Sequence, residues 1–200
     1  MNKQGIREQV KALMNRNDFT DALADTFIDQ GVARIQRTLR IPPMEKTEVY
    51  TITTIDPEIL VLPDDFLNIK YLYADRLLEY VDFGTFLKAP EEVGEPTIYT
   101  RVQAALKVKP TPAADSTITM IYYGEIPDLV NDTDENFLTA VAPDLLVYSA
   151  LTFAADYFVD ERKAVFEERF AAIYGELEEQ SRLTEMDQSA MRVQPAYSNY

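Results

Sequence analysis

The spacing of apolar residues changes twice along this chain. Between residues 18 and 41 apolar side chains recur every three or four positions, as on one face of an amphipathic helix. The positions on that face are Ile28, Val32, Ile35 and Leu39. Either Asn17 or Thr20 can cap the start of this helix. Pro42 and Pro43 end it, because proline lacks a backbone donor and restricts the residue before it.

A shorter helix is predicted before the long one. Residues 4–15 have the same period. The predicted apolar positions are Ile6, Val10, Leu13 and Met14. Because only residues 15–17 separate the two helices, we expect them to lie antiparallel as a helical hairpin.

Beyond the two prolines the pattern becomes that of β-strands. Seven short segments are rich in β-branched and aromatic residues, with turn residues between them about every ten positions. The predicted strands are 47–55, 59–62, 68–73, 76–81, 97–102, 105–109 and 117–123. We expect three hairpins among them: 47–55 with 59–62, 68–73 with 76–81, and 97–102 with 105–109. We also expect a helical turn at 63–67 and a short helix or loop at 82–88. Together the strands predict a small antiparallel sandwich or open barrel.

The helical period returns after Gly124. A short helix should follow the cap-rich residues 131–135, and a longer one should cover 144–158, directly behind Pro143. The last helix should run from 161 to about 185 with Asp160 as its cap. Two apolar seams are predicted on these helices: Leu146, Ala150, Phe153 and Tyr157, then Phe166, Phe170, Ile173 and Leu177.

The expected fold class is therefore α+β. An antiparallel helical bundle, made of the N-terminal hairpin and the C-terminal helices, carries an inserted antiparallel β module. We assign residues 1–46 and 131–187 to the bundle and 47–130 to the β module. Residues 188–200 are interpreted as a tail that is flexible until it docks.

Composition removes most kinds of chemistry. The 200 residues include no cysteine and no histidine, so thiolate nucleophiles, histidine bases and the commonest zinc ligands are missing. No glycine-rich phosphate loop and no G-x-S-x-G turn occurs. The acids at 131–137 begin like a calcium loop, but Phe137 and Pro143 stand where glycine and glutamate are needed. We therefore expect no enzyme, no cofactor and no metal site. We also expect neither a signal peptide nor a membrane span, since no apolar run is long enough.

The net charge of −15 is unevenly distributed. The first 46 residues are slightly basic, whereas the β module and the C-terminal helices are strongly acidic. An acidic body does not bind nucleic acid by releasing counterions. The charge favours solubility, or a surface that lies near DNA without retaining it.

Several segments, in their order along the chain, resemble the head-to-tail adaptor (connector) proteins of tailed bacteriophages. The segments are RIQRTLRIPPME at 34–45, LPDDFLNIKYL at 62–72, GEPTIYT…LKVKPTP at 94–112, TMIYYGEIPDL at 119–129, and ENFLTAVAPDLLVYSAL…A…F at 135–158. They cover most of the chain between Arg34 and Phe158, and none is a catalytic motif. The chain is unusually acidic for this family, and this difference affects docking surfaces more than the fold.

The resemblance implies a virion protein made in the host cytoplasm and placed at the head–tail junction. Such adaptors form a ring, commonly of twelve copies, beneath the portal protein, and tail or nozzle proteins attach below. Genomic DNA passes through the ring without specific binding, and no membrane takes part. A C-terminal tail that orders only on docking is also implied.

Contacts between copies can be predicted from the charges. A rotational ring needs two different faces on each protomer. The basic side chains Arg34, Arg37 and Arg40 on the long helix are expected to meet acids such as Glu167 or Glu178 of a neighbouring copy. In the tail, Tyr197 and Tyr200 are expected to contact the portal or a neighbour.

Tyrosines in the β module leave an alternative open. Tyr71, Tyr73, Tyr80, Tyr99, Tyr122 and Tyr123 lie in or beside predicted strands. If strand positions alternate, one set fills the sandwich and the other faces outward. An outward set would suit a protein interface or a carbohydrate- or receptor-binding accessory protein. A regulatory dimer that uses the bundle as its interface is a further alternative.

Overall fold

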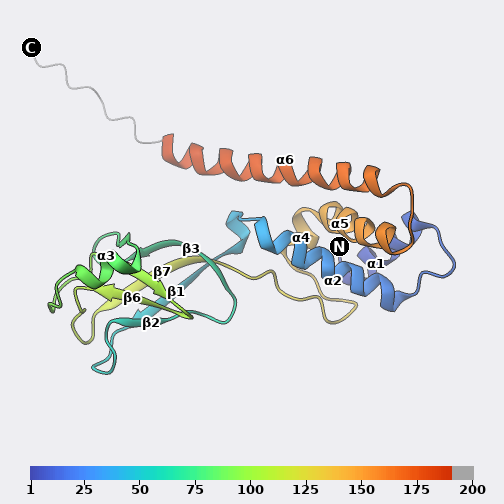
Figure 1. The fold of residues 1–200 in the computed structure, drawn as a ribbon. Helices are drawn as coiled ribbons and strands as arrows, with labels where there is room; N and C mark the ends of the chain where they lie inside the picture. The colour runs from blue at the N-terminus through green and yellow to red at the C-terminus, as the bar shows by residue number, and fades with distance from the viewer. Residues whose placement is uncertain (191–200) are drawn as a thin grey trace, which may run out of the picture. The chain divides into compact units, whose positions relative to one another are not determined.

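A computed structural model describes the backbone of residues 1–190 and the side chains of residues 1–184. The chain divides into two compact units (Figure 1). Unit 1 comprises Met1–Pro43 together with the chain from Ile126 onward, and unit 2 comprises Met44–Glu125. Helices dominate unit 1 and antiparallel sheets dominate unit 2, so the predicted α+β class is confirmed.

Unit 1 is a helical bundle arranged around one central helix. Its helices are α1 (Lys3–Met14), α2 (Asp21–Thr38), α4 (Phe137–Val141), α5 (Pro143–Tyr157) and α6 (Lys163–Ala190). α5 contacts all four of the others and is buried on most of its circumference. Gly31 of α2 makes this packing close, since a Cβ atom there would lie 3.3 Å from the backbone nitrogen of Ala150. None of the described helices is both long and apolar enough to cross a membrane.

Side-chain caps set where these helices begin. The Thr20 hydroxyl accepts a hydrogen bond from the Leu23 amide at 3.3 Å, so Thr20 and not Asn17 caps α2. Asn136 and Thr139 form a reciprocal capping box at the start of α4. Before α6, the Asp160 carboxylate accepts from the Arg162 amide at 2.9 Å. Each cap supplies an acceptor to an amide that has no partner within the helix.

Some positions on the predicted apolar faces are exposed. Leu13 and Tyr157 have 38% and 60% of their surface accessible, whereas Ile6, Val10 and Met14 are buried. Helix α6 also extends to Ala190, so residues 188–190 of the predicted tail are helical. The rest of that tail, with Tyr197 and Tyr200, lies outside the described residues.

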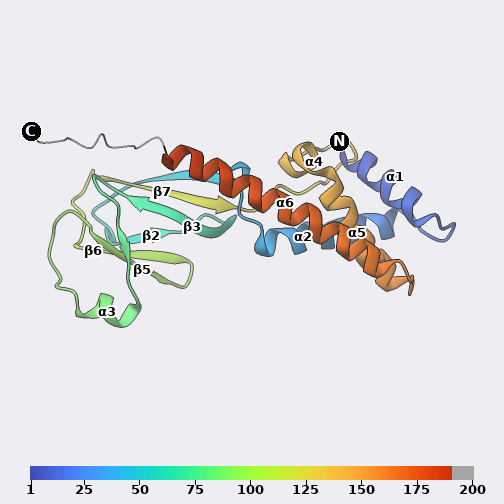
Figure 2. The same ribbon diagram turned by 90° about the horizontal axis from the view of Figure 1, so that it is seen from above.

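Unit 2 consists of two sheets and a short helix. Its strands are β1 (Glu45–Thr51), β2 (Ile59–Val61), β3 (Phe66–Tyr73), β4 (Glu79–Tyr80), β5 (Ile98–Val102), β6 (Ala105–Lys109) and β7 (Thr117–Gly124), and its helix is α3 (Phe83–Lys88). The first sheet has the strand order β1-β7-β3, and the second has the order β2-β6-β5-β4. Residues of both sheets form one core, which includes Leu60, Leu72, Val108, Ile118 and Met120. The unit is thus an open two-layer sandwich (Figure 2).

Strand pairing differs from the sequence prediction in two places. β2 pairs with β6 in the second sheet and not with β1, since Leu60 lies opposite Leu106 and both enter the core. The hairpin expected between 68–73 and 76–81 is reduced to one bridge between Tyr73 and Leu77. β4 instead pairs with β5, in parallel. Burial of Leu78 between the layers explains why the chain changes sheet there.

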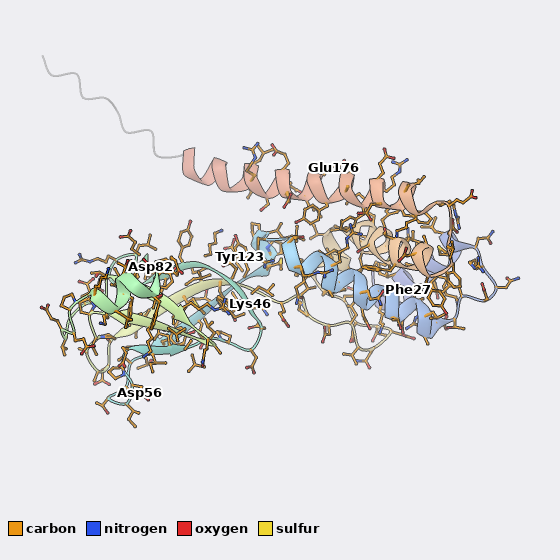
Figure 3. The ribbon with its side chains drawn as sticks, in the orientation of Figure 1. Phe27, Lys46, Asp56, Asp82, Tyr123 and Glu176 are labelled. Carbon is orange, nitrogen blue, oxygen red and sulfur yellow. The ribbon has the colours of Figure 1, made fainter. Side chains whose placement is uncertain are left out.

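Local structure around Pro63 also differs from the prediction. The turn expected at 63–67 is shorter: the Phe66 amide donates to the Pro63 carbonyl at 3.1 Å, and β3 already begins at Phe66. The expected hairpin of β5 and β6 is confirmed, with Gln103 at a φ of 55° in its turn. The short helix expected at 82–88 is present as α3, and the Asp82 side chain caps it (Figure 3).

Candidate assembly surfaces

Arg34 of α2 joins this helix to α6. The Arg34 guanidinium donates two hydrogen bonds to the Glu167 carboxylate, one of them at 2.9 Å between Nη1 and Oε2. The same guanidinium lies over the Phe170 ring, 3.9 Å from its centre. The hydrogen bonds from Arg34 lower the pKa of Glu167. Arg34 therefore joins the two helices through charge and ring stacking together.

The predicted contact residues fall into different groups. Arg34 and Glu167 pair within one chain, and Arg40 donates to the carbonyls of its own helix end, at 2.9 Å to Gln36 and 2.6 Å to Leu39. Arg37 is exposed and has no hydrogen bond or ion pair within the described part of the chain. Glu178 is exposed and hydrogen-bonded to Tyr174, whose pKa is raised by burial and further by the hydrogen bond to Glu178 and the charge of that carboxylate. Arg37 and Glu178 are therefore the predicted contact residues with the most accessible charge.

An apolar groove lies where α2 ends. A hollow of about 300 Å³ is lined by Ile41, Pro42, Pro43, Val141 of α4 and Leu177 of α6, together with the polar α6 residues Gln180, Ser181 and Thr184. The groove exists because the prolines stop α2 while α6 continues past that point. Sequence reasoning placed Leu177 on an apolar seam but missed the surface opposite it. The abrupt end of the apolar period at Pro42 and Pro43 could have indicated this surface.

The acidic segment at 131–136 has structural roles. Arg7 bridges Asp25 and Asp132, with 2.6 Å contacts to both, and its hydrogen bond lowers the pKa of Asp132. Asp134 accepts from the amides of Val130 and Asn131 at 2.9 and 2.7 Å, which lowers its pKa. Within the described residues no three acids gather as a metal site would require. The segment fixes the start of α1 and α4.

Tyrosines of unit 2 divide between the two sides of the sheets. Tyr99 and Tyr122 are buried, whereas Tyr71 and Tyr73 expose 47% and 38% of their surface. The Tyr122 hydroxyl donates to Asp65 at 3.0 Å, and burial together with that carboxylate raises the pKa of Tyr122 to about 12. The inner tyrosines thus stabilise the sandwich, and the outer ones are available for contact.

The chain combines two folded units with several surfaces that are open to contact. It is a two-unit α+β protein whose notable exposed features are charged helix flanks, an apolar groove and a tyrosine-bearing sheet. The chain belongs to the family described as SU10 adaptor protein, whose model matches residues 1–194. The comparison with curated proteins found no match. The predicted resemblance to phage adaptor proteins is therefore confirmed. An adaptor of this kind is a structural virion component that associates with portal and tail parts.

Proposed function

We propose that this protein is a head-to-tail adaptor that forms a ring beneath the portal, joins the capsid to the tail and leaves a passage for the genome. The supporting observation is the family match across residues 1–194, which spans both units. No catalytic step is part of this role. The protein is synthesised in the host cytoplasm and acts in the virion.

The arrangement of charges supports a ring. Closed rings need heterologous contacts, in which two different faces of each protomer meet. Arg37 lies exposed on α2, and Glu178 lies exposed on α6. Glu176, also on α6, is exposed as well (Figure 3). We infer that Arg37 of one copy meets Glu178 of the next, while Arg40, Tyr197 and Tyr200 contribute to docking on the portal.

Imaging with the portal protein of the same phage tests this proposal. The purified chain, mixed with portal rings, should add a second ring of density in negative-stain class averages. Portal rings without added density at saturating chain concentration would refute the adaptor role.

A charge swap tests the inferred contact. Arg37→Glu should weaken ring formation on the portal, and Glu178→Lys in the same chain should restore it. Arg101→Glu, an exposed reversal in unit 2, is the matched control and should assemble like the wild type. If Arg37→Glu assembles normally, Arg37 is not at the interface. That result would leave the proposed ring unaffected.

Passage of DNA requires that the ring does not retain it. With a net charge of −15, the chain should show no saturable binding to duplex DNA at about 150 mM salt, where the screening length is roughly 8 Å. Fluorescence anisotropy of a labelled duplex measures this. Nanomolar affinity that falls steeply with salt would contradict the proposed passage.

A further inference from the structure

The outer face of the β1-β7-β3 sheet is unusual in this acidic chain. Strand register places two rows of three side chains on it. Thr47, Ile121 and Tyr71 form one row, and Val49, Thr119 and Tyr73 form the next. Their inward neighbours Ile118, Met120 and Leu72 fill the core, so these six side chains point away from it. We call these six residues the neutral face.

No charged side chain belongs to these two rows. The nearest charged pair along the strands is Glu45 and Lys70, whose 2.6 Å ion pair closes one end of the face. The Lys70 ammonium also lies 6.0 Å from the centre of the Tyr71 ring, at the edge of the face. Val49, Tyr71 and Tyr73 expose 56%, 47% and 38% of their surface. Solvent-facing sides of antiparallel sheets are normally polar and charged, whereas interface cores lose charge and gain tyrosine. This face therefore has the composition of a contact surface.

A second exposed apolar feature lies on the opposite side of the same unit. Helix α3 covers the outer face of the β2-β6-β5-β4 sheet (Figure 2). Phe86 is buried there, and the Lys109 ammonium lies 5.1 Å from the centre of its ring. On its outward side, Phe83 and Leu87 are one turn apart and expose 49% and 63% of their surface. We call these two residues the α3 ridge. The neutral face and the α3 ridge thus lie on opposite outer layers of one sandwich.

We propose that the neutral face of one copy packs on the α3 ridge of the next copy in the ring. This rests on the proposed adaptor function and adds a contact between β modules to the one inferred between helices. Two different surfaces on opposite sides of one unit are the arrangement that a heterologous, closing contact needs. An isologous dimer would instead need one self-complementary face.

Charge determines where a second copy can pack. Every copy carries a net charge of −15, so neighbouring copies repel wherever acidic surfaces meet. The two rows of the neutral face carry no charge, and beside the α3 ridge the acids Glu58 and Glu91 are balanced by Lys107 and Lys109. These two surfaces can therefore meet without placing acid against acid. The neutral face is three strands wide at ~4.8 Å per strand and about four residues long at ~3.4 Å per residue, so its area is roughly 200 Å². That is less than the ~800 Å² per partner that holds a stable pair. It therefore acts only together with the other ring contacts.

Disulfide cross-linking tests this contact directly, because the natural chain has no cysteine. The double variant Thr119→Cys with Leu87→Cys should, after oxidation in rings assembled on portal protein, give a ladder of covalent oligomers on denaturing gels. Each single variant should give monomers only. Both side chains are at the surface of unit 2, so the substitutions leave its core intact.

Each outcome decides the proposal. Rings that assemble without a ladder overturn the neutral-face contact but leave the adaptor function standing. Covalent dimers from Thr119→Cys alone would show face-to-face packing and also overturn it. If no ring forms with the wild-type chain, the proposed function itself fails.

Lysine substitutions provide an independent check. Val49→Lys and Leu87→Lys should each reduce the fraction of chains assembled on the portal at least several-fold, since each replaces an apolar side chain of the contact by a charge. Val61→Lys is the matched control, because Val61 is 67% exposed but lies on β2, outside both surfaces. Equal loss in all three variants would indicate a general effect of charge and would refute the assigned contact.

Discussion

At the scale of single residues, ion pairs within the chain determine which charges are accessible. Arg34 combines a bidentate carboxylate contact with stacking on Phe170, whereas Arg37, three positions later, has neither. The two arginines therefore have different roles although both belong to the same sequence pattern. A pattern of arginines on a helix flank does not distinguish a structural residue from a docking residue.

Removing Arg34 should lower stability. Arg34→Ala loses the Glu167 pair and the ring contact, and we expect a loss of about 1–2 kcal/mol in unfolding free energy, reduced by the partial exposure of Glu167. Urea denaturation followed by circular dichroism measures it. Arg37→Ala is the control and should stay within about 0.5 kcal/mol of wild type. Equal losses in both variants would contradict the role given to Arg34.

Asp160 should make stability sensitive to acid. Hydrogen bonds from the Arg162 side chain, and then from its backbone amide, lower the pKa of Asp160 to about 2. Because the folded pKa lies below the unfolded value of about 3.9, the contribution is complete above that value. It is lost as the pH falls toward 2. Asp160→Asn should therefore show a smaller decrease in stability between about pH 4 and pH 2 than the wild type does. Parallel pH profiles of the two proteins would exclude this origin.

At the scale of elements, α6 has a weak point in its middle. Gly175 lies on the helix with open space where a Cβ atom would be, since no atom comes within 4 Å of that position. Glycine in a helix interior costs up to about 1 kcal/mol relative to alanine. Gly175→Ala should accordingly raise the unfolding free energy of the isolated chain by roughly 0.5–1 kcal/mol. Destabilisation would mean that the position is not as open as described.

At the scale of the whole molecule, unit 2 is an insertion whose two ends meet. Glu45 and Tyr123 face each other across neighbouring antiparallel strands, which places their Cα atoms about 5 Å apart. The first and last strands of the unit are thus paired over their full length. The chain enters and leaves unit 2 at one place.

Excision of unit 2 should therefore leave unit 1 folded. Replacing residues 45–124 by a short glycine–serine linker should preserve the helical circular dichroism of unit 1 and a cooperative thermal transition. Residues 44–125 expressed alone should show a β-type spectrum. Loss of cooperative unfolding in both pieces would refute two autonomous units.

Most elements and their approximate places could be predicted from the order of residues. Apolar periods of 3.6 and 2 residues, Thr20 among the candidate caps, and the break at Pro42 are local properties, so α2 and the β5–β6 hairpin could be predicted from neighbours a few residues away. The order of the segments that resemble adaptor proteins also indicated the family. Hydrophobic spacing was less informative for α5, because a central helix is buried on most sides and has no single apolar face.

Contacts between residues far apart in the sequence became visible in the fold alone. The pairing of β2 with β6, the bond between Arg34 and Glu167 and the uncharged outer face of β1, β7 and β3 join residues far apart in sequence. Such contacts depend on how two layers close over a shared core, and many pairings satisfy the same local pattern. The long helix ending at Pro42 was therefore predictable as an element, whereas the partner of each arginine along it was not.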